Sequence, residues 1–129
     1  MKIIIFLSIS ALSFSAVASS SHEMFINGCQ AYVSRYSLKT KPVDKKDLLP
    51  IGYCLGLVDG VSKSIYHYND KAICFPDDSL PSIKDLVNVV MTYVHKDPEK
   101  INKLSAMSVY STSDLVSLAL MEKYPCKKF

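Results

Sequence analysis

Four cysteines are the feature that most limits what this chain can fold into. They stand at positions 29, 54, 74 and 126 of a 129-residue chain. No C-x-x-C pair occurs, which disfavours a zinc knuckle, a thioredoxin-like pair and a haem attachment site. An even number of cysteines in a small exported chain is typical of a disulfide framework. We therefore expect two disulfides and no free thiol.

Export is predicted from the N-terminus. Lys2 precedes an apolar run over residues 3–14, and Ala16-Val17-Ala18 forms a small-x-small cleavage site. Residues 1–18 therefore predict a secretory signal peptide that is cleaved near Ala18, and residues 19–129 a single domain. The apolar run is shorter than the roughly 20 residues of a bilayer span. We expect no later segment to qualify either, and hence no membrane attachment after cleavage.

The charge of the chain disfavours nucleic acid as a partner. The formal net charge is +3, and removing the single charge of Lys2 leaves +2. Arg35 is the only arginine, so the chain has no basic stripe of the kind that nucleic-acid recognition needs.

Four helical segments are predicted, over about residues 23–37, 48–67, 82–97 and 111–124. The third is the clearest, because Ser82 and Asp85 form a variant of the capping box at its start. The apolar residues behind this cap recur with helical spacing: Ile83, Leu86, Val87, Val90, Met91 and Val94. No long segment alternates with period two, so we predict an all-α, disulfide-stapled bundle of about four helices. Whether residues 101–114 form a loop or a helix stays open.

The helical pattern also favours one disulfide pairing. If the first two segments form an antiparallel hairpin, Cys29 and Cys54 lie side by side, which leaves Cys74 for Cys126. A bond between Cys54 and Cys74 would require the chain to run back along a helix of about 20 Å in a few residues. We favour the pairs Cys29–Cys54 and Cys74–Cys126.

Three glycines form a narrow stripe on the second segment. Gly52, Gly56 and Gly60 recur every four residues, and each costs a helix about 1 kcal/mol relative to alanine. Close approach of another backbone would offset this cost. We favour tight packing against a helix of the same chain, and a subunit interface is the alternative. A membrane G-x-x-x-G dimer is excluded because the stretch is short and contains Asp59.

Candidate catalytic residues are scarce. We expect His22, next to the cleavage site, to be mobile, and His67 and His95 to have structural roles near helix ends. No G-x-S-x-G elbow, Gly-rich phosphate loop or EF-hand spacing occurs. We therefore predict that the chain is not an enzyme and has no catalytic residues, no metal site and no cofactor.

Two segments are candidates for contact with a protein partner. One is the amphipathic cluster that follows residue 65, and the other is a charged turn over residues 95–103. Core filling and a solvated turn are the alternatives for the two segments. The candidate partner-binding residues are Tyr66, His67, Tyr68, Lys71, His95, Lys96, Asp97, Pro98, Glu99, Lys100, Asn102 and Lys103.

An ordered set of short motifs resembles a known family. After a cysteine in the first helix come GYCLGLVDGV at 52–61, ICFP at 73–76, SIKDLVNVVMTYV at 82–94, DPE at 97–99 and ALMEKYPC at 119–126. This set resembles the type VI secretion amidase immunity (Tai/Rap) family of bacterial periplasmic proteins, over about residues 24–126. The stretch 101–114 is longer and richer in serine than the usual link of the family.

The resemblance implies a homodimeric helical inhibitor in the periplasm. Such proteins bind an incoming peptidoglycan amidase with a cysteine-histidine site, and a protruding segment blocks its cleft. We assign that segment to the 95–103 turn, supported by Tyr66 to Lys71. The alternative is a periplasmic helical chaperone or stress protein, which would bind many unfolded clients weakly rather than one folded amidase tightly.

Overall fold

The computed structural model describes residues 21–37, 42–68, 71–107 and 110–127. The predicted signal peptide lies outside these residues. The elements in chain order are α1 (Ser21–Ser37), the short 3₁₀ turn η1 (Lys45–Asp47), α2 (Leu48–Tyr68), the 3₁₀ turn η2 (Pro76–Asp78), α3 (Ile83–Lys96), α4 (Pro98–Ser105) and α5 (Thr112–Lys123). The described residues contain no strand, only an isolated bridge between Ile73 and Pro125. The all-α class is confirmed, with five helices instead of about four.

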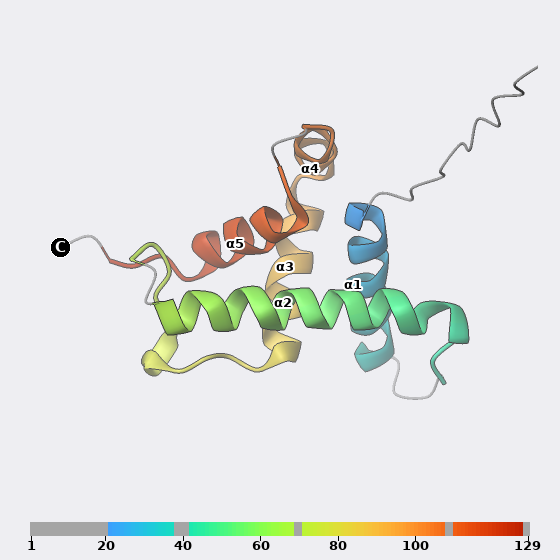
Figure 1. Ribbon diagram of the computed structural model, residues 1–129, viewed down its shortest axis with the longest axis horizontal. Helices are drawn as coiled ribbons and strands as arrows, with labels where there is room; N and C mark the ends of the chain where they lie inside the picture. Colours follow the sequence, from blue (N-terminus) through green and yellow to red (C-terminus); the bar gives the residue numbers. More distant parts are fainter. Residues whose placement is uncertain (1–20, 38–41, 69–70, 108–109, 128–129) are drawn as a thin grey trace, which may run out of the picture.

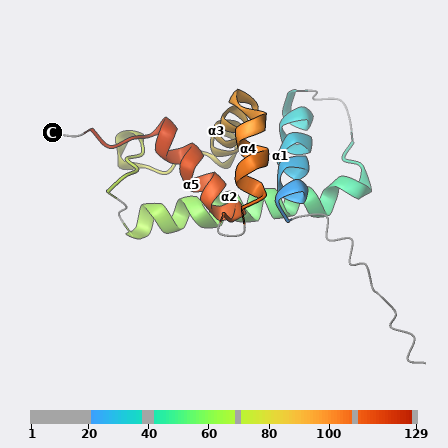
Figure 2. The same ribbon diagram turned by 90° about the horizontal axis from the view of Figure 1, so that it is seen from above.

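The long helix α2 organises the fold. It runs across the molecule in Figure 1, where α1 and α3 cross behind it and α5 lies above it. Seen from above, the other four helices all lie on one side of α2 (Figure 2). One face of α2 therefore packs on the bundle, through the buried Cys54, Val58 and Ser62, while the opposite face meets no other helix among the described residues.

Helices α1 and α2 approach each other most closely at Gly28. A Cβ atom at this position would overlap the backbone carbonyl group of Pro50, so only glycine fits there. The next residue, Cys29, is disulfide-bonded to Cys54, with Cα atoms 5.2 Å apart and both side chains fully buried. The bond and the glycine contact together fix α1 against the first half of α2. The sequence did not single out Gly28.

The second disulfide joins the segment after α2 to the end of α5. Cys74 is bonded to Cys126, with Cα atoms 4.8 Å apart. Beside it the backbone N–H of Cys74 donates to the carbonyl oxygen of Tyr124 at 2.8 Å. Both disulfides are the predicted pairs, but the expected antiparallel hairpin is wrong, because α1 crosses α2 at a steep angle in both Figure 1 and Figure 2.

Among the described elements, helix α3 supplies the largest share of the core. Its N-cap Ser82 accepts a hydrogen bond from the backbone N–H of Asp85 at 3.2 Å, as the capping pattern predicts. The predicted stripe is buried except for its first member Ile83, which is partly buried: Leu86, Val87, Val90, Met91 and Val94. Helix α5 starts with a complete capping box between Ser111 and Asp114. It packs on α3 through Leu115, Val116, Ala119 and Leu120.

The segment 95–103 is a helix corner, so the expectation of a turn is wrong. Helix α3 ends at Lys96, and α4 begins at Pro98 after a single residue. Asp97 is the N-cap of α4, and Pro98 occupies its first turn, where the missing N–H costs no hydrogen bond. The sequence identified Pro98 as a helix stop and missed that the same residue starts the next helix.

Helix α2 is unusually apolar for its exposure. The segment Lys45–Tyr68 is long and apolar enough to cross a bilayer, by length and composition alone, and 17% of its most apolar window is buried. The expectation that no later segment would qualify is therefore wrong. Much of the apolar surface of α2 is left uncovered by its own chain.

Candidate partner-binding surfaces

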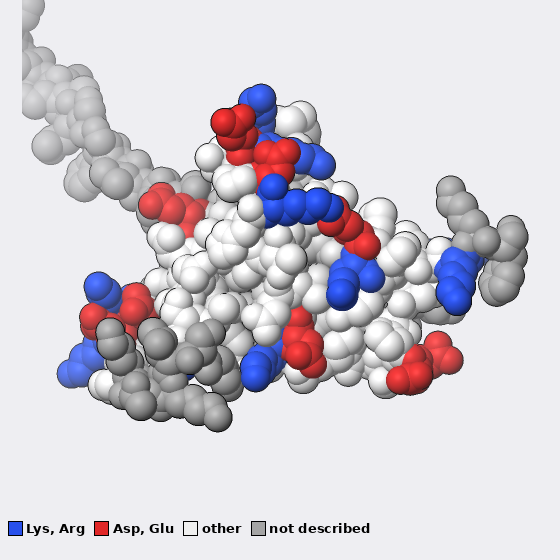
Figure 3. Space-filling view, turned by 180° about the vertical axis from the view of Figure 1, so that it is seen from behind, with Lys and Arg blue, Asp and Glu red and all other residues white. Residues whose placement is uncertain are grey.

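The first candidate surface is the α3–α4 corner, formed by residues 95–103. All eight predicted contact residues in it are exposed, and α4 buries a single side chain, Ile101. Acidic and basic side chains gather over this corner at the top of the molecule (Figure 3). The corner therefore presents charge on a short helix that projects from the bundle.

Hydrogen bonds hold the corner in place. The carboxylate of Asp97 accepts from the backbone N–H of Lys100 at 3.0 Å. The ammonium of Lys96 donates to the carboxylate of Glu122 on α5 at 2.8 Å, and this hydrogen bond raises the pKa of Lys96. Glu99, Lys100 and Lys103 form no ion pair among the residues that the structure describes. Asp97 and Lys96 thus support the corner, and these three charges are available to a partner.

The tyrosine cluster lies in another part of the molecule. Tyr66, His67 and Tyr68 end α2, far from α4 in both Figure 1 and Figure 2. Tyr66 donates a hydrogen bond to the carbonyl oxygen of Asp78 at 3.0 Å, which gives it a structural role. Tyr68 is 85% exposed, and Lys71 is exposed as well. The structure therefore does not join the two predicted segments into one site.

The second candidate surface is the outer face of α2, defined by Leu49, Gly52, Gly56, Gly60 and Lys63. A Cβ atom on any of these glycines would meet nothing within 4 Å, apart from the helix itself. The preferred expectation, tight packing against a helix of the same chain, is wrong because the stripe points away from the bundle. Leu49, at the start of this face, is 73% exposed.

Charge is scarce on this outer face. The only Asp, Glu, Lys or Arg residues in α2 are Asp59 and Lys63, which pair with each other at 2.7 Å. A helix face exposed to water normally carries polar and charged residues along its length. The alternative that the sequence left open, a subunit interface, fits this face better.

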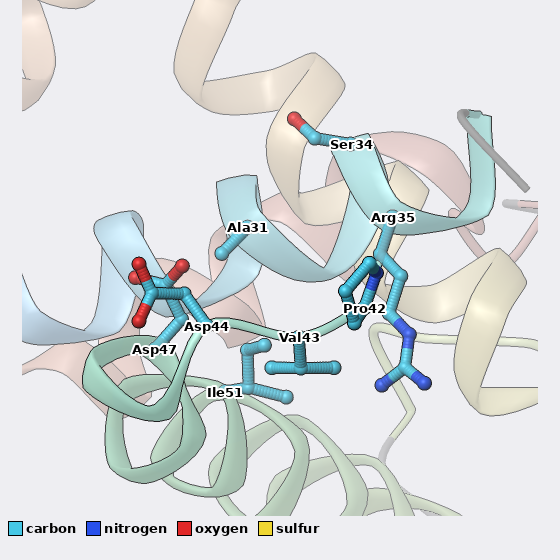
Figure 4. A pocket seen from close by; sticks show the side chains of 8 residues that line it. All are labelled: Ala31, Ser34, Arg35, Pro42, Val43, Asp44, Asp47 and Ile51. Carbon is cyan, nitrogen blue, oxygen red and sulfur yellow. The ribbon is translucent and has the colours of Figure 1, made fainter. Parts of the chain in front are cut away.

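A hollow of about 230 Å³ lies between the end of α1 and the start of α2. It is lined by Ala31, Ser34, Arg35, Pro42, Val43, Asp44, Asp47 and Ile51. Figure 4 shows the carboxylates of Asp44 and Asp47 at one end and the guanidinium of Arg35 at the other. Within the described ranges no three His, Cys, Asp or Glu side chains could hold a metal ion together. The separation of acid and base leaves this hollow without a catalytic pair.

His22 is buried, so the expectation of a mobile residue is wrong. Its side chain is 8% exposed, and its Nε2 atom has no hydrogen-bond partner. The hydroxyl of Tyr110 is also buried without a partner, and the two ring centroids are 6.1 Å apart. Burial lowers the pKa of His22 and raises the pKa of Tyr110 to about 12. His67 and His95 lie in the last turns of α2 and α3, as predicted.

Comparison with known proteins agrees with the family resemblance seen in the sequence. The family of Rap1a immunity proteins matches the chain over residues 21–126. No curated protein and no solved structure matches it. Immunity proteins act against secreted toxins and are generally not enzymes, and the two disulfides agree with a place outside the cytoplasm. Because the match spans most of the chain, the protein belongs to the Rap1a family of immunity proteins.

Proposed function

We propose that this chain is a periplasmic immunity protein that binds a peptidoglycan amidase delivered by a type VI secretion system and blocks its active-site cleft. Membership of the Rap1a family supports an immunity role. The observation that carries the placement is the α3–α4 corner, where a short charged helix projects from a disulfide-linked bundle.

The corner is suited to enter a cleft because it is already ordered. Asp97 caps α4, Ile101 anchors it in the core, and the Lys96–Glu122 ion pair ties its start to α5. A segment that is ordered before binding loses less conformational entropy on association than a free loop does. The charges of Glu99, Lys100 and Lys103 would then set specificity, because charged residues at an interface select the partner more than they add affinity.

We also propose that the protein is a homodimer in which the outer faces of two α2 helices meet. Each glycine costs α2 about 1 kcal/mol relative to alanine, and no contact within the chain offsets this cost. Glycines at this spacing would let a second backbone come close. The scarcity of charge lowers the cost of removing the face from water.

A chaperone for unfolded clients remains the second candidate function. The observation that favours it is the exposed apolar start of α2, where Leu48 and Leu49 are 57% and 73% exposed. Such a protein would bind many denatured proteins weakly. An immunity protein binds one folded amidase tightly, so binding of denatured proteins separates the two functions.

The toxin-binding test needs a small cysteine-histidine amidase, which we expect to be encoded in a neighbouring reading frame. Replacing Glu99, Lys100 and Lys103 by alanine should raise the Kd about 10- to 100-fold, the range of energetically important interface residues. Asp97 is left intact because loss of this helix cap would cost about 1 kcal/mol by itself.

The matched control is a Lys45→Ala/Lys127→Ala variant, which removes exposed charge away from the corner. It should bind like the unmodified protein, and both variants should keep the same midpoint of thermal unfolding. Equal affinity of the corner variant and the unmodified protein would refute the placement. An amidase that the unmodified protein does not bind would refute the function.

Sedimentation equilibrium tests the homodimer. The protein should sediment with twice the mass of the exported chain. Gly56→Leu should reduce this to the mass of one chain, because the leucine side chain would occupy the outer face of α2 where the second backbone would approach. A single-chain mass for the unmodified protein would contradict the interface. Stable binding of the protein to phosphatidylethanolamine–phosphatidylglycerol vesicles would instead assign the outer face to a membrane.

A further inference from the structure

Two buried polar atoms without partners meet where α1 begins. Among the described residues, the Nε2 atom of His22 and the hydroxyl of Tyr110 both lack a hydrogen-bond partner, and their rings are 6.1 Å apart and tilted at 54°. His22 is in the first turn of α1, whereas Tyr110 belongs to the connection between α4 and α5. Unsatisfied buried polar atoms are rare in native structures and call for an explanation.

The same place joins α4 to α1. A hollow of about 350 Å³ is lined by His22, Glu23, Ile26 and Asn27 of α1 and by Asn102 and Ser105 of α4. Figure 1 shows α4 above the N-terminal end of α1, so the two helices come near each other around this hollow. Since Ile101 is the only residue of α4 that is buried, the position of α4 depends strongly on these neighbours.

His22 accommodates only a neutral imidazole in this position. Its side chain is 8% exposed, and burial without a hydrogen bond disfavours a cation. The start of a helix carries a partial positive charge, which adds to this penalty. Burial accordingly holds the pKa of His22 below its ordinary value of 6.5.

The titratable and charged groups near His22 come from α1, α3, α5 and the residues beside Tyr110. Glu23 is its neighbour on α1, and the α4 residues at the hollow, Asn102 and Ser105, are uncharged. The pKa of Tyr110 is raised to about 12, with small contributions from Tyr93 on α3 and Asp114 on α5. Hydrogen bonds from Ser111 lower the pKa of Asp114, so Asp114 stays ionised.

We propose that His22 and Tyr110 form a latch that closes α4 against α1 at neutral pH and opens when His22 is protonated in acid. The imidazolium ion must reach water, and the cheapest route is to separate His22, at the start of α1, from Tyr110. Helix α4 then loses its support while the core of α1, α2, α3 and α5 stays folded. Local opening of this kind is typical of elements with few buried contacts.

The latch makes toxin binding sensitive to pH, a consequence that depends on the proposed function. A group whose pKa is lowered on folding does not destabilise the folded state at pH values above its unfolded pKa, which is 6.5 for His22. Stability of the closed corner is therefore complete above pH 6.5 and is lost as the pH falls toward the lowered value. Within this window the opening equilibrium rises about tenfold for each pH unit.

Amide hydrogen exchange of the exported protein between pH 7.5 and 5 tests the latch without any toxin. After correction for the intrinsic pH dependence of exchange, amides of Lys100 to Ser105 should exchange up to about tenfold faster per pH unit. His22→Phe should abolish this acceleration. The matched control His67→Gln/His95→Gln, which alters two exposed histidines, should keep it.

An NMR titration of His22 in the unmodified protein keeps the latch testable even if the His22→Phe variant does not fold. A pKa below 6.5 together with acid-accelerated exchange in α4 supports the latch. A pKa at or above 6.5, or equal acceleration in His22→Phe, would overturn it. The affinity for the amidase is measured separately, so pH-sensitive exchange without amidase binding would refute the proposed function and leave the latch standing.

Discussion

The inner and outer faces of α2 both involve glycine, for opposite reasons. On the inner side, Gly28 of α1 has no room for a Cβ atom because the carbonyl group of Pro50 occupies that space. On the outer side, Gly52, Gly56 and Gly60 have open space in front of them. The first glycine is required by the folded chain itself. A Cβ atom on the other three would meet no described residue outside the helix itself, and the proposed homodimer would give these glycines a partner.

Removing the inner disulfide should have the largest effect on stability. The Cys29→Ala/Cys54→Ala variant opens a loop closed over 25 residues and should lower the free energy of unfolding by about 3–5 kcal/mol. Urea unfolding at a protein concentration that keeps the chain monomeric measures this loss. A loss below about 1 kcal/mol would mean that α1 is held on α2 by packing alone.

Adding one methyl group at the contact between Gly28 and Pro50 should have the second-largest effect on stability. Gly28→Ala forces the backbones of α1 and α2 apart and should cost about 3 kcal/mol, at the upper end for an overpacked core. Asn27→Ala is the matched control, because Asn27 directly precedes Gly28 and its side chain is exposed. Unfolding of both variants at the same urea concentration would contradict the close approach of the α1 and α2 backbones at Gly28.

Adding the same methyl group on the outer face should change the free energy of unfolding in the opposite direction. Gly56→Ala has no neighbour to overlap and should raise the free energy of unfolding of the monomer by about 1 kcal/mol through helix propensity. Under dimer-forming conditions the gain should shrink, because the added methyl groups separate the two α2 backbones. A clear loss of stability in the monomer would contradict an open outer face.

The ion pair on the outer face should matter least. Lys63→Ala breaks the exposed pair with Asp59 and should lower the free energy of unfolding by about 0.3–0.5 kcal/mol, less at high salt. Measurement at low and at high ionic strength checks the electrostatic origin of this effect. A loss above about 1 kcal/mol would indicate that Lys63 has a further partner.

Local signals in the sequence were enough for most of the fold. The capping pattern at Ser82 and the apolar stripe behind it predicted α3. The contact expected between the first two helices predicted the disulfide pairs, although these helices cross and do not run antiparallel. The role of Pro98 was harder to predict, because a proline can follow the end of one helix or begin the next. The hydrogen bond by which Asp97 caps α4 shows that Pro98 begins α4.

The surfaces depended on tertiary contacts that no local pattern carries. The glycine stripe was visible, but whether it faced the bundle was decided by how α1, α3 and α5 pack on α2. His22 was expected to be mobile because it lies near the cleavage site, and its burial depends on Tyr110, which is 88 positions later in the sequence. Gly28 was missed because a single glycine in a helical segment gives no signal without its neighbour Pro50.

The most direct test of the proposed immunity role uses a small cysteine-histidine amidase, sought in the reading frames beside the gene for this protein, and measures its inhibition on purified peptidoglycan. Adding increasing amounts of this protein should lower the hydrolysis rate linearly, to near zero at one chain per amidase. The corner variant without the charges of Glu99, Lys100 and Lys103 should require a clear excess. An amidase that keeps its full activity in a large excess of the folded protein would contradict the account.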